Sequence, residues 1–277
     1  MNLKPEVIIS RSNTLVKWVA SLQNKKERNE EKCFIAEGIK LTKEALECKL
    51  SVTHIFVSEG KSAAVLKELS ECLSSDFYSS TQVVIVSDSV FEKISTEKAP
   101  QGVISVIKYL DFFNNADIIY KEDFFLSKDE KAIFLCSVRD PSNLGAIIRS
   151  AVAFGFDRII LSSDCADVYN PKTIRSAMGG IFKVYITVVA SVERFIEAAR
   201  LNGRRVLAAE LNSEALTLDE VELTKNDIVI IGNEGHGIPG DISSLCDDSI
   251  FIPISDKTES LNASVAASII MWEQRKG

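Results

Sequence analysis

Residues 132–155, AIFLCSVRDPSNLGAIIRSAVAFG, decide the fold, because they join a strand to a helix through a short polar turn. The apolar run 132–138 has the length of a strand, Pro141 ends it, and the apolar residues of 144–154 follow helical spacing. This alternation continues to the end of the chain and predicts an α/β fold, with a parallel sheet covered by helices on both faces. The predicted strands are 132–138, 158–162, 183–188, 205–209, 227–231 and 249–252, and the predicted helices are 144–154, 172–178, 192–201 and 261–274.

The chain before this sheet predicts a smaller α/β domain over residues 1–110. Asn13 is placed to cap a first helix, which carries Lys25 to Arg28 at its polar end. Residues 111–130 are aromatic, amidic and acidic without periodicity, and they are predicted to link the small domain to a second domain over 131–277. The predicted strands of the small domain are 52–57, 83–86 and 103–107, and its predicted helices are 39–47, 63–73 and 90–94.

The composition is that of a globular protein. With 277 residues, 46% of them hydrophobic and 26% charged, it excludes disorder, collagen and coiled coil. The longest apolar runs are strand-sized, so no membrane span is predicted. The first residues lack the basic cluster and apolar core of a secretory signal, which favours a cytoplasmic location. Six cysteines without a C-x-x-C pair and only two histidines predict buried, reduced thiols and no metal site.

The charge is unevenly distributed along the chain. The net charge of -7 argues against nucleic acid if taken globally, because phosphate binding needs lysines and arginines. Residues 1–49, however, carry a net charge of +3, which leaves -10 on the rest. This split permits a local basic face on the small domain, and a solvated helix surface is the alternative explanation of the same charges.

Three segments follow predicted strands, at the edge where ligands bind parallel sheets. The first, 139–149, holds Asn143, which is either a simple helix cap or a functional amide, and Arg149, whose guanidinium among apolar neighbours needs a carboxylate, a phosphate or water. The second, 231–239 (IGNEGHGIP), has three glycines that let backbone approach a ligand. Its spacing is not that of a dinucleotide site or a P-loop, and His236 in it is interpreted as a loop residue.

The third segment combines 251–254 (FIPI) with 259–270 (ESLNASVAASII). Ser260 and Asn262 at the start of its predicted helix offer caps or hydrogen bonds to a ligand. The small residues Ala263, Ala266 and Ala267 predict close packing of this helix against another element, and a second subunit is one candidate for that element.

Taken together, the three segments closely resemble the motifs of the SpoU-type, or TrmH-like, RNA 2′-O-ribose methyltransferases of the SPOUT class. The shared patterns are N-x-G-x-x-x-R with a following F-G, then G-N-E-G-x-G, then I-P-I with E-S-L-N-x-S-V-A-A. Residues 170–180 are similar to the linking segment of that family, although a serine is more usual at Ala177. The resemblance covers 132–277. The first third is similar, more loosely, to the substrate-binding domain that often precedes it, through residues 25–28, 34–38 and 100–103.

The resemblance implies a trefoil knot at the end of the parallel sheet, which pattern reasoning does not predict because connections are normally unknotted. It implies S-adenosylmethionine as cofactor, a homodimer, and RNA as the substrate, with ribosomal RNA favoured and transfer RNA the second choice. The positions carried over as cofactor-binding are Gly232, Ile252 and Leu261, and those carried over as catalytic are Asn143, Arg149, Glu234, Ser260 and Asn262.

The implied reaction is attack of a ribose 2′-hydroxyl on the sulfonium methyl. Because a guanidinium has a pKa above about 12, we assign Arg149 to orienting the RNA phosphate and hydroxyl, with the proton passing to that phosphate or to water. Glu234 and Asn262 would position Arg149 and the ribose. Two alternatives remain: a catalytically silent RNA-binding or ribosome-assembly protein of the same fold, and a nucleotide-dependent enzyme of another class.

Overall fold

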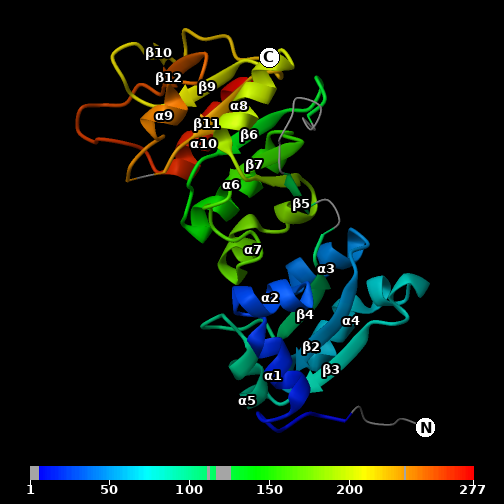
Figure 1. The fold of residues 1–277 in the computed structure, drawn as a ribbon. Coiled ribbons are helices and arrows are strands. Elements are labelled where there is room, and N and C mark those ends of the chain that lie inside the picture. Colours follow the sequence, from blue (N-terminus) through cyan, green and yellow to red (C-terminus); the bar gives the residue numbers. More distant parts are fainter. Residues whose placement is uncertain (1–5, 111–112, 117–125, 234) are drawn as a thin grey trace. The chain divides into compact units, whose positions relative to one another are not determined.

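A computed structural model describes residues 6–110, 113–116, 126–233 and 235–277. The chain forms two compact units, and the division does not follow the sequence continuously (Figure 1). The first unit contains Met1–Leu110 together with Tyr169–Phe182, and the second contains Asp111–Val168 together with Lys183–Gly277. Among the described residues, no helix is long and apolar enough to cross a membrane.

The first unit is built on a four-stranded mixed sheet in the order β1-β4-β2-β3, in which β4 is antiparallel to both of its neighbours and β2 and β3 are parallel. Its strands are β1 (Cys33–Glu37), β2 (Val52–Ser58), β3 (Gln82–Val86) and β4 (Val103–Lys108), and its helices before residue 110 are α1 (Thr14–Ser21), α2 (Lys25–Glu31), α3 (Ile39–Glu47), α4 (Ser62–Leu73) and α5 (Asp88–Ile94).

The predicted first helix is wrong at its polar end, because α1 stops and a separate helix, α2, begins at Lys25. Arg28 explains the break. Its side chain is 1% exposed, and Nη1 donates to the carbonyls of Leu22 and Gln23 at 2.8 and 2.7 Å. The guanidinium thereby satisfies carbonyls at the end of α1 that have no partner within the helix.

Residues 169–182, predicted as part of the second domain, pack in the first unit. Their helix α7 (Pro171–Ala177) contacts β1 with Thr173, Ile174 and Ala177 buried. Tyr169 stacks on Phe34 and Tyr109, with ring centroids 4.7 and 4.0 Å away. Apolar and aromatic burial thus assigns this segment to the first unit, although strands of the second unit precede and follow it in the chain.

The second unit confirms the predicted parallel sheet. Its eight strands are all parallel to their neighbours, in the order β10-β12-β9-β11-β6-β7-β8-β5. The strands are β5 (Phe113–Ala116), β6 (Ala132–Leu135), β7 (Arg158–Ser162), β8 (Tyr185–Val189), β9 (Val206–Ala209), β10 (Leu216–Thr217), β11 (Ile228–Ile231) and β12 (Asp248–Phe251), and the helices are α6 (Pro141–Ala153), α8 (Val192–Leu201), α9 (Gly240–Ser243) and α10 (Ala263–Gln274). Strand β5 lies within the range predicted as linker and pairs with β8.

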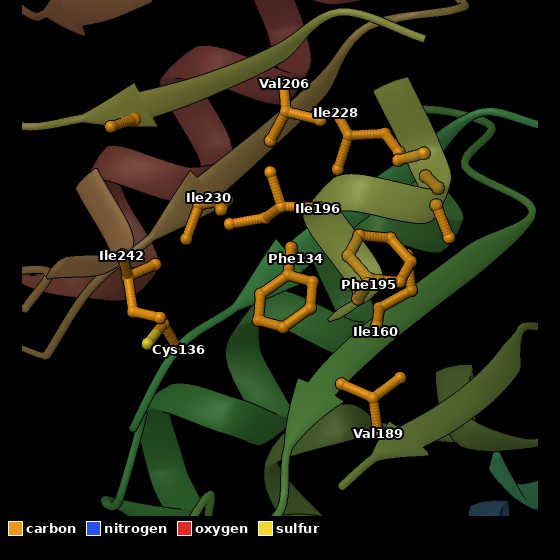
Figure 2. Close-up of a cluster of buried hydrophobic side chains, with 14 of the residues drawn as sticks. Phe134, Cys136, Ile160, Val189, Phe195, Ile196, Val206, Ile228, Ile230 and Ile242 are labelled. Atoms are coloured by element: carbon orange, nitrogen blue, oxygen red, sulfur yellow. The ribbon is translucent and has the colours of Figure 1, made fainter. Parts of the chain in front are cut away.

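Both faces of this sheet are covered. On one face Phe195 and Ile196 of α8 pack over Phe134 and Ile230, which belong to the two central strands β6 and β11 (Figure 2). On the other side α10 packs against α6 and β11. Every residue of β6, β7 and β11 is buried, which is why these strands are apolar along their length instead of alternating.

Candidate functional site

The first motif forms the start of α6, directly beyond the carboxyl end of β6. Asp140 caps this helix, since its Oδ1 accepts from the N–H groups of Ser142 and Asn143 at 2.7 and 3.0 Å. The interpretation of Asn143 as the cap is therefore wrong, and Asn143 is the third residue of the helix. An aspartate followed by a proline at the first helical position is a sequence signal for this arrangement.

The first and third motifs meet through their asparagines. Asn262 Nδ2 donates to Asn143 Oδ1 at 3.0 Å, across a separation of 119 residues. Asn262 is also the cap of α10, because its Oδ1 accepts from the backbone N–H of Ser264 at 2.9 Å. The same two helices are joined further along by a hydrogen bond between Ser150 and Ser268.

The other predicted catalytic residues differ in their surroundings. Arg149 is exposed on α6, and its guanidinium has no hydrogen bond or ion pair with any residue that the structure describes. No described residue therefore supplies the acceptor that the sequence indicated for this guanidinium. Ser260 is exposed in the loop before α10, where its carbonyl accepts from Thr258 Oγ1 at 3.2 Å. Glu234 lies outside the described residues.

The second motif is a tight turn after β11. The backbones of Asn233 and Gly237 exchange two hydrogen bonds of 3.1 and 2.8 Å, and Asn233 Oδ1 accepts from the N–H of Gly235 at 2.9 Å. A Cβ on Gly232 would lie 2.5 Å from the carbonyl carbon of Gly237, so only glycine fits that position. The glycines thus close the turn on itself and leave backbone in place of side chains at the edge of the sheet.

Three further residues, which sequence reasoning missed, hold this turn to the first motif. Ser137, in the loop after β6, adopts a positive φ of 58°. Its carbonyl accepts from Asn233 Nδ2 at 2.9 Å, and its hydroxyl donates to Asp164 Oδ2 at 2.7 Å. Serine, asparagine and aspartate in loops follow no sequence pattern that predicts hydrogen bonds among them. Asn233 does, however, lie within a motif that the sequence singled out.

The carboxylate of Asp164 is stabilised in its charged form. Partial burial raises its pKa, but hydrogen bonds from Arg139, Ser162 and Ser137 and the positive charge of Arg139 outweigh burial and lower the pKa to about 2. Asp164 is therefore an anion, and a hydrogen-bond acceptor only, throughout the neutral range.

The positions carried over as cofactor-binding fall at one edge of the sheet. Gly232 directly follows β11, Ile252 directly follows β12, and Leu261 precedes the cap of α10. All three residues are half-buried. Carboxyl ends of parallel strands are where such sheets bind nucleotide-like ligands. The glycine turn suits S-adenosylmethionine, because backbone groups can meet a flat adenosine where a side chain would be in the way.

Two surface hollows of the second unit lie at the opposite, amino edge. The larger, of about 740 Å³, is lined by residues of α8 and by Arg204, Arg205 and Asp247, and the smaller, of about 460 Å³, includes Arg205 and Asp227. Neither contains a residue that the sequence assigned to chemistry. We therefore place the candidate site at the carboxyl edge, where the motifs converge, and not in either of these hollows.

A parallel sheet with these three loops at its carboxyl edge defines the class of RNA-modifying methyltransferases that the motifs predicted. Residues 130–272 match the model of the SpoU rRNA Methylase family, and residues 13–105 match that of the MRM3-like substrate binding domain. The chain therefore belongs to the SpoU rRNA Methylase family. The resemblance inferred from the three motifs is thus confirmed, including the substrate-binding domain before them.

Relatives with the same arrangement share about a quarter of their residues with this chain. The 23S rRNA (guanosine(2553)-2′-O)-methyltransferase RlmP of Bacillus subtilis (strain 168) is 28% identical over 97% of this chain and 98% of its own length. The crystal structure of an AdoMet-bound rRNA methyltransferase from Sinorhizobium meliloti is 27% identical, with a TM-score of 0.80 over 98% of this chain and 97% of that one. A putative TrmH-family RNA methyltransferase from Porphyromonas gingivalis is 28% identical, with a TM-score of 0.78 over 96% and 98%.

Proposed function

We propose that this protein transfers a methyl group from S-adenosylmethionine to a ribose 2′-hydroxyl of RNA, with ribosomal RNA as the favoured substrate and transfer RNA as the second choice. The observation that carries the proposal is the hydrogen bond between Asn143 and Asn262, which brings the first and third family motifs together beside the glycine turn of the second. The relatives support the same reaction, since RlmP of Bacillus subtilis is named as a 23S rRNA 2′-O-methyltransferase.

The residues divide the work of the reaction between binding and alignment. Gly232, Ile252 and Leu261 would hold the cofactor, whose sulfonium supplies an already activated methyl group. Arg149 projects an exposed, positively charged guanidinium that is suited to an RNA phosphate and to the ribose oxygen as it gains negative charge. Asn143 and Asn262, fixed to each other, would align the ribose, and Glu234 and Ser260 complete the set. Alignment alone can contribute about 7–11 kcal/mol to such a step.

The catalytically silent alternative is less well supported. A protein that only binds RNA needs none of the catalytic residue types, yet Asn143, Arg149, Glu234, Ser260 and Asn262 are all present. A nucleotide-dependent enzyme of another class is disfavoured by family membership and by a glycine turn that lacks the dinucleotide spacing.

A homodimer is part of this proposal. Of the three small residues that the sequence offered as an interface, Ala263 and Ala267 are buried inside the unit and Ala266 is half-buried, so the close packing of Ala263 and Ala267 is intramolecular. The outward side of α10 instead shows Val265, Ile269 and Trp272, which are 46%, 37% and 47% exposed and recur at helical spacing. An apolar stripe of this kind supports a two-fold contact between copies of the chain.

The knot and the cellular compartment also belong to the proposal. The chain passes from β12, beyond β9, to α10, which packs on α6 and β11, and this return across the sheet beside the glycine turn supports a knotted connection. A cytoplasmic location is supported by the cysteines, which are all thiols. Burial raises the pKa of Cys165 to about 11 and that of Cys246 to about 12, as expected of inert reduced thiols.

The test is transfer of labelled methyl from S-adenosylmethionine by the purified chain, offered unmodified ribosomal RNA in one arm and transfer RNA in another. We expect incorporation into ribosomal RNA at one ribose, located by mapping 2′-O-methylation. Cofactor binding without transfer to either RNA, or to ribosomal particles, would favour the silent protein. Transfer to transfer RNA alone would keep the chemistry and overturn the favoured substrate.

A further inference from the structure

Ser137, Asp164 and Asn233 form a hydrogen-bonded chain between three loops at the carboxyl edge of the large sheet. Ser137 follows β6, Asp164 follows β7 and Asn233 follows β11, so adjacent strands deliver all three. Each member bonds the next directly, from Asp164 Oδ2 to the Ser137 hydroxyl at 2.7 Å, and from the Ser137 carbonyl to Asn233 Nδ2 at 2.9 Å.

Ser137 occupies a backbone conformation that glycine normally supplies. A positive φ is unfavourable for a non-glycine residue, and such residues persist where the surrounding contacts hold them in place. Here all three polar groups of the residue are engaged, because its N–H also donates to Ser162 Oγ at 2.8 Å. Ser162 in turn donates to Asp164 Oδ1 at 2.7 Å. The Asp164 carboxylate therefore accepts both from Ser137 and from Ser162, the residue that binds the Ser137 N–H.

At the other end of this hydrogen-bonded series, the side-chain amide of Asn233 uses its oxygen and its nitrogen for different bonds. Oδ1 bonds the Gly235 N–H within the turn, whereas Nδ2 reaches out of the turn to Ser137. In the sequence, Glu234, which is expected to be catalytic, lies between Asn233 and Gly235. Gly232, which is expected to bind the cofactor, immediately precedes Asn233. The position of the turn relative to the first motif therefore depends on the Nδ2 bond.

We propose that Asp164, Ser137 and Asn233 are positioning residues for methyl transfer, which set the second-motif turn in register with α6 and its Arg149. Asp164 is the fixed end, because it also accepts from Nη2 of Arg139 at 2.8 Å, and Arg139 lies two residues before α6 begins. One carboxylate thus anchors the approach to the first motif and, through Ser137, the second. This inference rests on the proposed methyltransferase function.

Three single substitutions separate this role from simple stabilisation. Asn233→Asp keeps an oxygen for Gly235 but removes the donor to Ser137. Ser137→Gly keeps the positive φ and the carbonyl but removes the hydroxyl that reaches Asp164. Asp164→Asn removes the anionic acceptor. The matched control is Asp129→Asn, which removes an exposed carboxylate paired with Lys225 at the other edge.

We expect each of the three variants to lower kcat about 10- to 100-fold at saturating RNA and cofactor, the scale of a misalignment near 1 Å. The calorimetric affinity for S-adenosylmethionine should stay within about three-fold, because the turn keeps its internal bonds, and the control should match the unsubstituted protein. In the double variant Asp164→Asn with Asn233→Asp, the losses should not multiply, since both break one chain of contacts.

The outcomes that overturn the inference are distinct from failure of the proposed function. An unsubstituted protein that methylates no RNA removes the function itself. An active protein whose variants keep kcat within two-fold, or lose only thermal stability, leaves these residues a structural role. Hydrogen exchange of residues 228–239 gives a measurement that does not depend on activity. If exchange in Asn233→Asp is no faster than in Asp129→Asn, the bond from Asn233 to Ser137 does not hold the turn in place.

Discussion

The two edges of the large sheet are both rich in polar side chains, but they use them differently. At the amino edge arginines are paired: Arg158 bonds Glu130 at 2.8 Å, Arg205 bonds both oxygens of Asp227 at 3.1 and 2.7 Å, and Arg200 bonds Asp247 at 2.8 Å. At the carboxyl edge the motif loops are joined mainly by amides and hydroxyls that bond one another and Asp164, whose arginine partner is Arg139 at 2.8 Å, and Arg149 is left without a partner among the described residues.

The difference shows that polar density and surface hollows do not by themselves mark a site. The larger hollow lies at the amino edge, where Arg200 and Asp247 of its lining pair with each other and Arg205 pairs with Asp227 beside it. The carboxyl edge instead offers a cation, Arg149, without a partner among the described residues, a glycine-rich turn, and amides held in place by their neighbours. Substitutions at the carboxyl edge should therefore affect activity, and those at the amino edge should affect stability.

The largest effect is expected for Gly232→Val at the carboxyl edge. The added Cβ would strike the Gly237–Ile238 backbone at 2.5–2.7 Å, so the turn must move. We expect cofactor affinity, measured by calorimetry, to fall at least about 100-fold. Gly240→Ala is the control, because a Cβ there meets nothing within 4 Å. Normal cofactor affinity in a folded Gly232→Val protein would show that the turn does not bind the cofactor.

Arg149→Ala should come next. It removes a charge assigned to phosphate and ribose, so methyl transfer should fall by about 100-fold while cofactor affinity and the melting temperature remain nearly unchanged. Arg194→Ala, which removes an exposed arginine from α8, serves as the control. Near-normal turnover at saturating RNA would show that the first motif has been given the wrong role, and loss of cofactor binding would move Arg149 into the cofactor site.

Arg158→Ala tests the amino edge. The side chains of Arg158 and Glu130 are only 11% and 20% exposed, so losing one partner leaves a mostly buried, unpaired charge. We expect a loss of about 3 kcal/mol in unfolding free energy, seen as a lower denaturant midpoint, with kcat unchanged at low temperature. Lys225→Ala breaks an exposed pair and should change neither quantity. A loss of kcat without a loss of stability in Arg158→Ala would show that the amino edge also contributes to activity.

The smallest effect concerns acid. The native pKa of Asp164 is about 2, below its ordinary value of 3.8, so the native state binds this proton less readily than the unfolded state. Its contribution to stability is therefore complete above about pH 4 and disappears as the pH falls towards 2. Unfolding followed from pH 5 to pH 2 should show a slightly weaker pH dependence in Asp164→Asn, and an identical pH dependence would show that Asp164 is not held as a stabilised anion.

Periodicity predicted most of the large sheet because its strands are apolar throughout and its helices are amphipathic. The ranges predicted for β7 and α8 coincide with the observed ones, and those of the other elements predicted after residue 131 differ by a few residues at their ends. Periodicity missed the break between α1 and α2, which depends on Arg28 reaching back to carbonyls. It also missed β5, whose residues have no apolar pattern, the short elements β10 and α9, and strand β1 of the first unit.

The site was predicted in part, and for a different reason. Family motifs located Asn143 and Asn262, and the structure brings these two together. Neither motifs nor spacing pointed to Ser137 or Asp164, because their importance arises only when the ends of two strands are placed side by side. The location of residues 169–182 was likewise hidden, since the aromatic partners of Tyr169 lie far away in the sequence.

That 169–182 segment also determines when the first unit can finish folding during synthesis. Phe182 follows Leu110 by 72 residues, which at roughly 5–20 residues per second corresponds to a delay of roughly 4–14 s on the ribosome. Until residues 169–182 have been made, the face of β1 that α7 covers stays without that cover, and Phe34 stays without its stacking partner Tyr169. A nascent chain stalled in this interval would present an incompletely covered sheet to chaperones, although every residue of its first domain by sequence had already been made.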